Sequence, residues 1–431
     1  MKVLVIGAGF VGLTTACVLA STGVTVFLED TDKKKLDLIF EGKAPFFEEG
    51  LGELLEQSLN NQKLQPYNWK IQPDLTFITV GTPSLANGSI DLSFVSQALA
   101  KCNKNLKPNS LVAIKSTVIP GTTREFQGMA IAKNLELLMI PEFLREGSAV
   151  KDALHPDRIV IGARSSEIAQ TVATLLGITS QQLIITTTYS AESIKYISNS
   201  FLAACISFTN DVFSNFNHDP DYQVDDILLG WHSDKRFSAD NHGDIGLIQY
   251  LIPGPGFGGS CFPKDIRALQ HSFMTSGNPS SIVDGVVLVN QKIVELASTW
   301  IESIIPESEK FVIFGMAFKD GTDDIRESPS VSLVSAFTRI TPNGYWVDQF
   351  IKNQTDIFGL KPATAIEEII DVDFVILMHH DEYYRKLIQD QVKKRGTDKK
   401  LKVLAMRNQK PIDGTIWLRP RQKEAGLNNE F

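Results

Sequence analysis

A glycine-containing turn near the N-terminus constrains the fold more than any other stretch of the chain. Residues Lys2–Ile6 form a short apolar, β-branched run, which is typical of a strand buried on both faces. Gly7, Gly9 and Gly12 follow in Gly-x-Gly-x-x-Gly spacing, and a helix-forming stretch comes next. The run Val24–Leu28 predicts a second buried strand. Together these segments predict a βαβ unit, and hence a parallel sheet.

The same turn predicts a dinucleotide site. The first glycine makes the tight turn, the second admits a pyrophosphate, and the third lets the helix pack closely on the strand. Amide groups at the helix N-terminus then bind the phosphate charge. Asp30, at the end of the second strand, is placed to bind the ribose hydroxyls and would repel the 2′-phosphate of NADP. We therefore expect NAD; the alternative is a glycine turn without a ligand.

Several polar residues are expected to share one crevice. Four further strands are predicted, at Leu75–Val80, Leu111–Lys115, Leu137–Ile140 and Ile159–Gly162. Ligands of an open parallel sheet bind outside the carboxyl ends of its strands, so Thr82, Thr117 and Glu142 are expected to converge. Ordinary helix capping by Thr is the alternative, and for Thr82 it is equally favoured.

The next part of the chain predicts a helical domain. From Ala191 apolar residues recur at helical spacing, and this less strand-like stretch runs to about Leu296. Lys195 and Asn199 lie one turn apart on a face that we expect to point into the crevice, although surface exposure is usual for lysine. The polar stretch Asp219–His242 predicts a surface loop.

A second glycine-rich loop precedes a single cysteine. It reads Gly-Pro-Gly-Phe-Gly-Gly-Ser-Cys-Phe-Pro-Lys-Asp from Gly254 to Asp265. Glycines let a backbone approach a ligand closely, so the loop is expected to wrap a substrate and present Cys261 to it. Lys264 lies three residues further on, and its charge favours the nucleophilic thiolate. A tight turn around a buried structural cysteine is the alternative.

A second, smaller α/β domain is predicted after the linker Pro306–Lys310. Its predicted strands are Phe311–Phe314, Gly344–Val347 and Asp373–Met378, and its predicted helices are Ser330–Thr338 and Thr364–Ile370. Lys319 and Arg326 follow its first strand and suit phosphate groups, although a charged turn is the alternative. The polar tail Arg419–Phe431 is expected to be mobile.

Composition excludes several other classes of function. The net charge of −8, from 42 basic and 50 acidic residues, argues against nucleic acid or an anionic membrane as partner. Cys17, Cys102, Cys205 and Cys261 lack CxxC spacing, so we expect reduced thiols in the cytoplasm and no metal site. No apolar run approaches membrane-spanning length, and the N-terminus lacks a signal-peptide cleavage site.

These motifs together resemble the UDP-glucose/GDP-mannose dehydrogenase family. The resemblance covers nearly the whole chain and is carried by Val3–Gly12, Lys115–Val118, Pro141–Gly147, Ile194–Asn199, Gly256–Asp265 and Lys319–Pro329. It implies an NAD-binding Rossmann domain over residues 1–190 and a helical middle domain over residues 191–300 that carries the cysteine loop and dimerises. A smaller Rossmann-like α/β domain over residues 308–431 would bind the nucleotide of the sugar.

The resemblance also implies a reaction. The C6 alcohol of a nucleotide sugar, expected to be UDP-glucose, is oxidised to a carboxylate with two NAD, through a thiohemiacetal and a thioester on Cys261. In such enzymes Lys195 and Asn199 would stabilise oxyanions, and Glu142 would act as base in hydrolysis. Asp265 and Thr117 would hold a proton-relaying water.

Binding residues follow from the same resemblance. Contacts to NAD are expected from Gly7, Gly9, Phe10, Val11, Gly12, Asp30, Lys35, Thr82, Thr117, Glu146, Lys264 and Arg326. Contacts to the sugar nucleotide are expected from Phe143, Leu144, Arg145, Glu146, Gly147, Lys195, Asn199, Tyr250, Leu251, Ile252, Pro253, Gly254, Gly258 and Lys319, with Arg236 reaching the substrate of a partner subunit.

The chain departs from the family pattern in three places, of which the last two lie in the nucleotide half and bear on the nucleotide sugar. Arg236 stands farther before Cys261 than expected, the stretch Ala405–Asn408 lacks the usual Asp, and His379-His380 replaces a Thr-x-Trp pattern. A GDP-mannose dehydrogenase is therefore the nearest alternative, followed by enzymes for N-acetylated sugars. A two-electron hydroxyacid dehydrogenase and a non-catalytic NAD sensor are alternatives of other classes.

Overall fold

The computed structural model divides the chain into two compact units. It describes residues 1–178, 181–216, 221–237, 246–337, 343–351, 355–363, 369, 371–379, 381–395, 400–407 and 410–419. The first unit comprises residues 1–198 and 267–278, and the second comprises residues 199–266 and 279–431. Two helices, α8 (Thr188–Phe216) and α10 (Phe262–Thr275), each contribute residues to both units.

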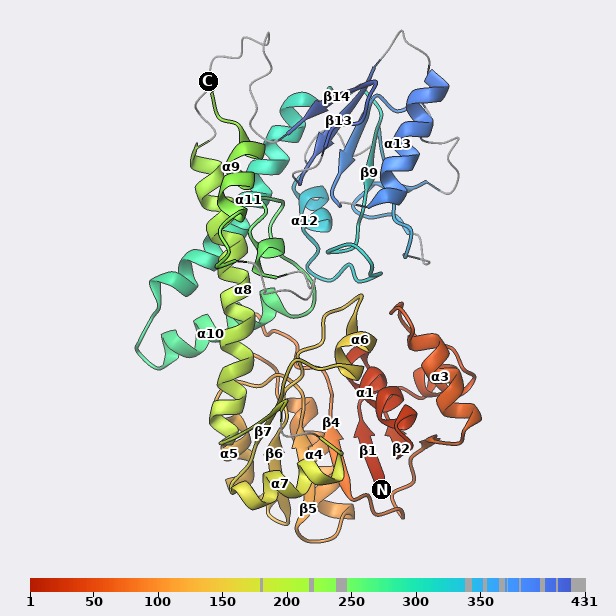
Figure 1. Cartoon of the computed structure of the whole chain (residues 1–431), viewed down its shortest axis with the longest axis vertical. Coiled ribbons are helices and arrows are strands. Elements are labelled where there is room, and N and C mark those ends of the chain that lie inside the picture. Colours follow the sequence, from red (N-terminus) through yellow and green to blue (C-terminus); the bar gives the residue numbers. More distant parts are fainter. Residues whose placement is uncertain are drawn as a thin grey trace. The chain divides into compact units, whose positions relative to one another are not determined.

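An eight-stranded sheet forms the centre of the first unit, in the order β3-β2-β1-β4-β5-β6-β7-β8 (Figure 1). Strands β1 to β6 are parallel, and the order of the first six strands is that of a doubly wound dinucleotide fold. The strands are β1 (Lys2–Ile6), β2 (Thr25–Glu29), β3 (Leu64–Pro66), β4 (Leu75–Ile78), β5 (Ser110–Ile114), β6 (Leu135–Met139), β7 (Ile159–Gly162) and β8 (Leu183–Thr186). The predicted Rossmann fold is confirmed, although β3 and β8 were not predicted.

Neighbouring strands of this sheet are parallel except at one place. Strand β7 pairs antiparallel with β6 through Met139 and Gly162. The only α-helix between these strands is α6 (Ala149–Leu154), whose six residues span about 9 Å. A parallel crossover needs a connection that runs back along the whole strand, and α6 is too short to do so.

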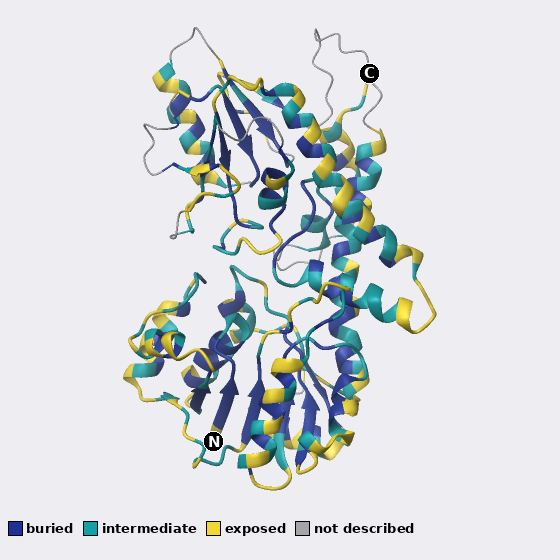
Figure 2. Cartoon of the chain, turned by 180° about the vertical axis from the view of Figure 1, so that it is seen from behind, coloured by how far each residue is buried: buried dark blue, intermediate teal, exposed yellow. Residues whose placement is uncertain are grey.

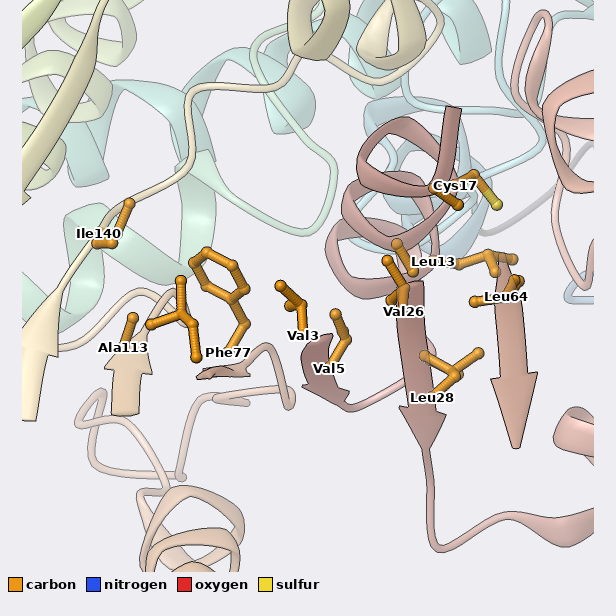
Figure 3. Packing of buried hydrophobic residues seen from close by; sticks show 14 of the residues in the cluster. Val3, Val5, Leu13, Cys17, Val26, Leu28, Leu64, Phe77, Ala113 and Ile140 are labelled. Atoms are coloured by element: carbon orange, nitrogen blue, oxygen red, sulfur yellow. The ribbon is translucent and has the colours of Figure 1, made fainter. Parts of the chain in front are cut away.

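Apolar side chains on both faces of this sheet build a three-layer core. Along β1, Val3 and Val5 pack on one face with α1 (Phe10–Ser21), while Leu4 and Ile6 pack on the other. Figure 3 shows the first face, where side chains of α1 point at those of the strands. Helices α2 (Lys33–Phe40), α3 (Leu51–Asn60) and α7 (Ser166–Leu175) join α1 in covering it. Helices α4 (Ser93–Asn105) and α5 (Thr122–Gly128), with the first turns of α8, cover the opposite face.

The second unit begins with helices, and one of them corrects a prediction. Helix α9 (Val224–His232) lies within the stretch Asp219–His242 that we expected to be a loop. Asp225 and Asp226 occupy its first turn, where carboxylates favour the helix dipole, and Leu228 is buried. The acidic residues that made the stretch look like a loop therefore help to start a helix. Helix α11 (Ser281–Ile304) and a short 3₁₀ turn (Leu247–Tyr250) complete this part.

A six-stranded parallel sheet forms the rest of the second unit, in the order β11-β10-β9-β12-β13-β14. Its central strands β9, β12 and β13 are deeply buried (Figure 2), and the strands again follow the doubly wound order. They are β9 (Phe311–Phe314), β10 (Gly344–Val347), β11 (Lys361–Pro362), β12 (Phe374–Leu377), β13 (Leu401–Ala405) and β14 (Thr415–Leu418). The second α/β fold is thus confirmed, with helices α11 and α12 (Pro329–Ala336) on one face and α13 (Glu382–Arg395) on the other.

Some predictions fall outside the described residues. They concern the helix Thr364–Ile370, nearly all of the tail beyond Arg419, His380 and Asn408. Among the described residues, no helix is both long enough and apolar enough to span a membrane.

The turn after β1 gives a prediction about stability. A Cβ on Gly12 would lie 1.8 Å from the carbonyl oxygen of Gly7, whereas a Cβ on Gly9 would have no atom within 4 Å. Because the close contact is with backbone, Gly12→Ala is expected to lower the free energy of unfolding by about 1–3 kcal/mol. The matched control, Gly9→Ala, is expected to change it by only a few tenths. Urea unfolding of both variants without NAD measures the difference, and equal losses would contradict this account.

Candidate active site

The turn between β1 and α1 has the geometry of a dinucleotide site. Gly7 has φ +104°, a conformation that side chains rarely adopt, and Gly12 packs directly on the carbonyl of Gly7. Gly9 caps the N-terminus of α1 without a side chain, and the space where its Cβ would project is open. Phe10 and Val11 begin α1 and are only partly buried. The turn therefore leaves room for a phosphate at the helix N-terminus.

Asp30 is fixed at the end of β2. One carboxylate oxygen accepts from Ala8 N at 2.7 Å and pairs with Lys35 Nζ at 3.1 Å, and the other accepts from Asp32 N at 2.8 Å. Burial by itself raises the pKa of Asp30, but the amide donors and Lys35 lower it below its ordinary value. A carboxylate held ionised here suits ribose hydroxyls, so the residues present fit NAD.

Two predicted crevice residues contact each other at the ends of β4 and β5. The Thr82 hydroxyl donates to the Thr117 carbonyl at 3.0 Å, and the Ser116 hydroxyl donates to the Val80 carbonyl at 2.7 Å. These bonds tie together the loops that follow neighbouring strands. The convergence expected from sheet topology therefore holds for Thr82 and Thr117.

A buried ion pair joins the loop after β6 to α8. Lys195 Nζ lies 2.7 Å from Glu142 Oε1, and the two residues are only 3% and 5% exposed. Glu142 Oε2 accepts from Leu144 N at 2.6 Å. Burial raises the pKa of Glu142, but Lys195, the Leu144 amide and the charge of Lys115 together lower it. Lys195 is thus not a surface lysine, and Glu142 is held as a carboxylate.

The segment that follows Glu142 is held by carboxylates. Gly147 N and Ala149 N both donate to the buried Glu48, each at 2.7 Å. Arg145 is exposed and grips Asp152 with Nε at 3.0 Å and Nη2 at 2.6 Å. Glu146 is partly buried in the same segment. The loop therefore has a fixed shape, and Glu48, which the sequence analysis did not single out, fixes it.

Two cations lie near the ring of Phe143. The Arg158 guanidinium is 4.1 Å from the ring centroid and Lys195 Nζ is 5.6 Å from it. Arg158 also donates to the Ser198 hydroxyl of α8 at 3.3 Å. These contacts hold the start of the loop against α8.

A second residue that the sequence analysis missed binds the loop carrying Thr117. The fully buried Glu192 of α8 accepts from Gly121 N at 2.5 Å, from Thr123 N at 2.7 Å and from the Thr123 hydroxyl at 2.6 Å. Glu192 lies one turn before Lys195. The only sequence signal for Glu192 was its position close to Lys195 on the same predicted helix.

In the second unit, Asn199 and Asp265 form a buried pair. The Asn199 Nδ2 donates to Asp265 Oδ2 at 2.6 Å, and Asp265 is 1% exposed. Lys264 Nζ binds the other carboxylate oxygen of Asp265. The charge of Lys264, which we expected to favour the Cys261 thiolate, is therefore directed at its neighbour.

Cys261 lies at the start of α10. Its carbonyl accepts from Asp265 N at 2.8 Å, so the residue immediately precedes the first turn of a 14-residue helix. Its sulfur lies 3.6 Å from the Ser260 hydroxyl, and the residue is partly exposed. Partial charge at a helix N-terminus stabilises a thiolate. The helix N-terminus, and not Lys264, is thus the feature that would favour a thiolate at Cys261.

The glycines of the cysteine loop are needed where it packs on its own chain. A Cβ on Gly258 would lie 2.2 Å from the Glu327 carbonyl oxygen, and one on Gly259 would lie 2.7 Å from the Phe318 ring. Gly259 N donates to the Arg326 carbonyl at 3.0 Å. The loop is thus pressed against the segment that follows β9, which the sequence analysis predicted as a phosphate-binding stretch.

The stretch Tyr250–Gly254 is anchored to α8 and lies beside a partly buried cation. Gly254 N donates to Asn210 Oδ1 at 2.8 Å, and a Cβ on Gly254 would lie 3.3 Å from Arg407 Cγ. Burial lowers the pKa of Arg407. Leu251 is buried, and the rings of Tyr250 and Phe262 lie 6.3 Å apart. Arg407 belongs to the stretch that lacks the usual Asp of the family pattern.

Three predicted binding cations lie at the surface or beside it. Arg326 grips Asp324 with Nε at 2.8 Å and Nη2 at 2.7 Å. Arg236 binds Asp234, and its side chain is 84% exposed. Lys319 Nζ is 5.6 Å from the centroid of the Phe318 ring. The structure therefore does not bring Arg236 to any of the other predicted residues of its unit.

In both sheets an aspartate that follows one strand accepts hydrogen bonds from backbone amides that follow the neighbouring strand. Asp348, after β10, accepts from Met316 N at 2.8 Å and Ala317 N at 3.0 Å, as Asp30 does from Ala8 N. His379 lies against Gly315, and its Nε2 is 2.8 Å from the Ala317 carbonyl. Burial lowers the pKa of His379 to about 4, so it is neutral at pH 7.

No group of side chains able to hold a metal ion occurs among the residues described.

Comparison with protein families gives three matches, all within one family. Residues 1–177 match the NAD binding domain of the UDP-glucose/GDP-mannose dehydrogenase family, residues 189–292 its central domain, and residues 312–409 its UDP binding domain.

Individual proteins agree with the family match. A UDP-glucose 6-dehydrogenase of Rickettsia bellii is 35% identical over 78% of this chain and 77% of its own length. One from Bacillus subtilis is 35% identical over 77% of this chain and 76% of its own. The solved UDP-glucose dehydrogenase of Pyrobaculum islandicum has a TM-score of 0.82 at 28% identity, covering 97% of this chain and 96% of that one.

Domain matches along the whole chain, relatives of this identity and the dinucleotide turn lead to one assignment. The chain belongs to the UDP-glucose/GDP-mannose dehydrogenase family and is an NAD-dependent nucleotide-sugar dehydrogenase.

Proposed function

We propose that the chain oxidises the C6 alcohol of UDP-glucose to the carboxylate of UDP-glucuronate. The observation that carries this proposal is Cys261, partly exposed at the N-terminus of α10 and followed by the buried Asp265–Asn199 pair. A two-electron oxidation to a ketone or aldehyde needs no such nucleophile. The relatives at 35% identity, named UDP-glucose 6-dehydrogenases, support the choice of substrate.

Covalent attachment to Cys261 would keep the aldehyde from being released between the two oxidations. NAD, when bound, accepts the hydride in each of the two oxidations. The alcohol loses a hydride and a proton to become an aldehyde, and the thiolate of Cys261 adds to its carbon, giving a thiohemiacetal. Loss of a second hydride and proton leaves a thioester. Water then breaks the carbon–sulfur bond, releasing the carboxylate and restoring the thiol.

The two buried pairs, Glu142–Lys195 and Asp265–Asn199, suggest roles for their members in the reaction. Lys195 and Asn199 donate to oxygen atoms that gain negative charge, because each offers N–H groups held in a fixed position by a carboxylate. Glu142, kept ionised, is the base that activates water for hydrolysis of the thioester. Asp265 and Thr117 hold the water that relays protons.

Substrate and cofactor contacts remain as the sequence predicts them. The loop Phe143–Gly147, the stretch Tyr250–Gly254, Gly258 and Lys319 are assigned to the nucleotide sugar. Asp30, Lys35, Thr82, Glu146, Lys264 and Arg326 join the glycine turn in binding NAD. The division into domains of residues 1–190, 191–300 and 308–431 is likewise part of the proposal.

A homodimer is part of the same proposal. Helix α8 leaves Phe201, Phe208 and Phe216 55%, 59% and 61% exposed. Large aromatic side chains along one helix are expected to be covered by a partner. Arg236, exposed and away from the other predicted residues, then suits a contact with the partner's substrate. The free cysteines suit a reducing compartment, and we propose the cytoplasm.

The first prediction of this proposal concerns the sugar nucleotide. With NAD, the purified protein is expected to form NADH faster with UDP-glucose than with GDP-mannose or UDP-N-acetylmannosamine. The expected difference in kcat/KM is at least about 100-fold, because a bulky N-acetyl group or another base must displace buried contacts. Stopped-flow or steady-state absorbance of NADH measures it. Preference for GDP-mannose would move the proposal to the nearest alternative.

The second prediction concerns Cys261. Cys261→Ala removes the nucleophile without adding bulk, so UDP-glucuronate is expected to disappear while NAD and UDP-glucose still bind. Cys205→Ala, at a partly buried cysteine of α8, is the matched control and should keep the wild-type rate. Product analysis by chromatography, with calorimetry for binding, makes the comparison. Uronate production by Cys261→Ala at near wild-type rate would refute covalent catalysis.

The third prediction concerns Asp30. Asp30→Asn removes the negative charge that repels a 2′-phosphate, so the ratio of kcat/KM for NAD over NADP is expected to fall by about 10-fold or more. Asp32→Asn removes a charge two residues away without touching Ala8 N and serves as control. An unchanged ratio in Asp30→Asn would show that Asp30 does not select the cofactor.

A further inference from the structure

The segment Gly254–Ser260 leads into Cys261 and forms neither helix nor strand. Its backbone groups therefore have no partners from regular secondary structure and need them from other parts of the chain. Two such contacts are described above, from Gly254 N to the Asn210 side chain and from Gly259 N to the Arg326 carbonyl. The residue between them, Phe257, is held by a side chain of α11.

Asn290 of α11 binds both backbone groups of Phe257. The Phe257 N–H donates to Asn290 Oδ1 at 2.8 Å, and Asn290 Nδ2 donates to the Phe257 carbonyl at 3.1 Å. One amide side chain thus supplies the acceptor and the donor that a neighbouring strand would supply in a sheet. Two bonds to the same residue fix its orientation as well as its position.

Gly256 makes this contact possible. It has φ +101°, which side chains rarely adopt, and a Cβ on it would lie 2.6 Å from Asn290 Oδ1. A side chain at residue 256 would therefore displace the Asn290 amide or the loop. The glycine is needed for Asn290 to reach Phe257.

Phe257 in turn packs against the residue that follows Cys261. The Phe257 side chain belongs to a residue that is only 6% exposed, and its ring lies 6.2 Å from that of Phe262 at 78°, an edge-on contact. Phe262 is the first residue of α10. The backbone of Phe257 is thus fixed by Asn290, while its ring contacts the start of the helix that carries Cys261 at its N-terminus.

We propose that Asn290 is a further positioning residue of this dehydrogenase, which holds the cysteine loop so that the Cys261 sulfur can capture the aldehyde. Asn290 acts through Phe257 and Phe262, so it is not a catalytic residue. The inference rests on the covalent mechanism proposed above for Cys261.

The capture step depends steeply on position. A thiolate adds to a carbonyl carbon from about 3–3.5 Å and along a restricted direction, and a displacement of about 1 Å can slow such a step about 100-fold. An aldehyde that is captured slowly has time to leave the protein. Loosening of the Cys261 loop is therefore expected to change which product is released, as well as the rate.

The test is the yield of NADH per UDP-glucose consumed, measured for Asn290→Ala with a hydrazine present to trap aldehyde. Wild type is expected to give two NADH and no trapped aldehyde. The variant is expected to give fewer than two NADH, with trapped aldehyde making up the difference, and to form UDP-glucuronate roughly 10- to 100-fold more slowly. Its Kd for NAD is expected to be unchanged, because Asn290 belongs to the second unit and the dinucleotide turn to the first.

Two more variants complete the comparison. Gln291→Ala, at the exposed next residue of α11, is the matched control and should give two NADH per sugar. Asn290→Asp keeps the shape of the side chain and an acceptor for Phe257 N, but it loses the N–H that binds the Phe257 carbonyl. It is expected to release aldehyde as well, and it decides the question if Asn290→Ala does not fold.

The yield per sugar separates positioning from stability. A variant that is only less stable contains fewer active molecules, yet each of them still forms two NADH per sugar. Two NADH per sugar without trapped aldehyde in the folded Asn290 variants, at whatever rate, would therefore overturn the inference.

A parallel measurement on Cys261→Ala distinguishes this inference from the proposed function. If Cys261→Ala still forms UDP-glucuronate, the covalent mechanism fails and the inference for Asn290 fails with it. If Cys261→Ala forms none while Asn290→Ala and Asn290→Asp behave as wild type, only the inference for Asn290 fails.

Discussion

Buried carboxylates need hydrogen-bond donors or cations as partners, and these pairings position the side chains of the candidate site. Glu142 is paired with Lys195, Asp265 with Asn199 and Lys264, and Asp30 with amide groups of the dinucleotide turn. Losing one partner leaves a buried charge uncompensated, which is strongly destabilising, so each pair fixes both of its members. The side chains that we assign to chemistry are therefore held in place before a substrate binds, as electrostatic catalysis requires.

Helix α8 supplies partners to several of these carboxylates. Within about two successive turns it carries Glu192, Lys195 and Asn199, each bonded to a different segment of the chain. Glu192 holds the loop of Thr117, Lys195 holds the loop of Glu142, and Asn199 holds the start of α10. Each of these contacts joins residues that are far apart in sequence.

The sequence predicted the parts of the site that rest on local patterns. The glycine spacing, the strand before it and Asp30 predicted the dinucleotide turn, since each depends on residues within one βαβ unit. Glu48 and Glu192 were not predicted, because their importance lies in partners distant along the chain; Glu48 and Gly147 are 99 residues apart. Helix α9 was missed because Asp225 and Asp226 count as polar in a composition, although at a helix N-terminus they favour helix formation. The roles of the site residues stay predictions.

The central claim is that one protein carries the sugar through both oxidations without releasing an aldehyde. The most direct measurement is the amount of NADH formed per molecule of UDP-glucose consumed, with an aldehyde-trapping reagent such as a hydrazine present. Covalent retention on Cys261 predicts two NADH per sugar and no trapped aldehyde. One NADH per sugar, or aldehyde captured by the reagent in stoichiometric amounts, would contradict the account.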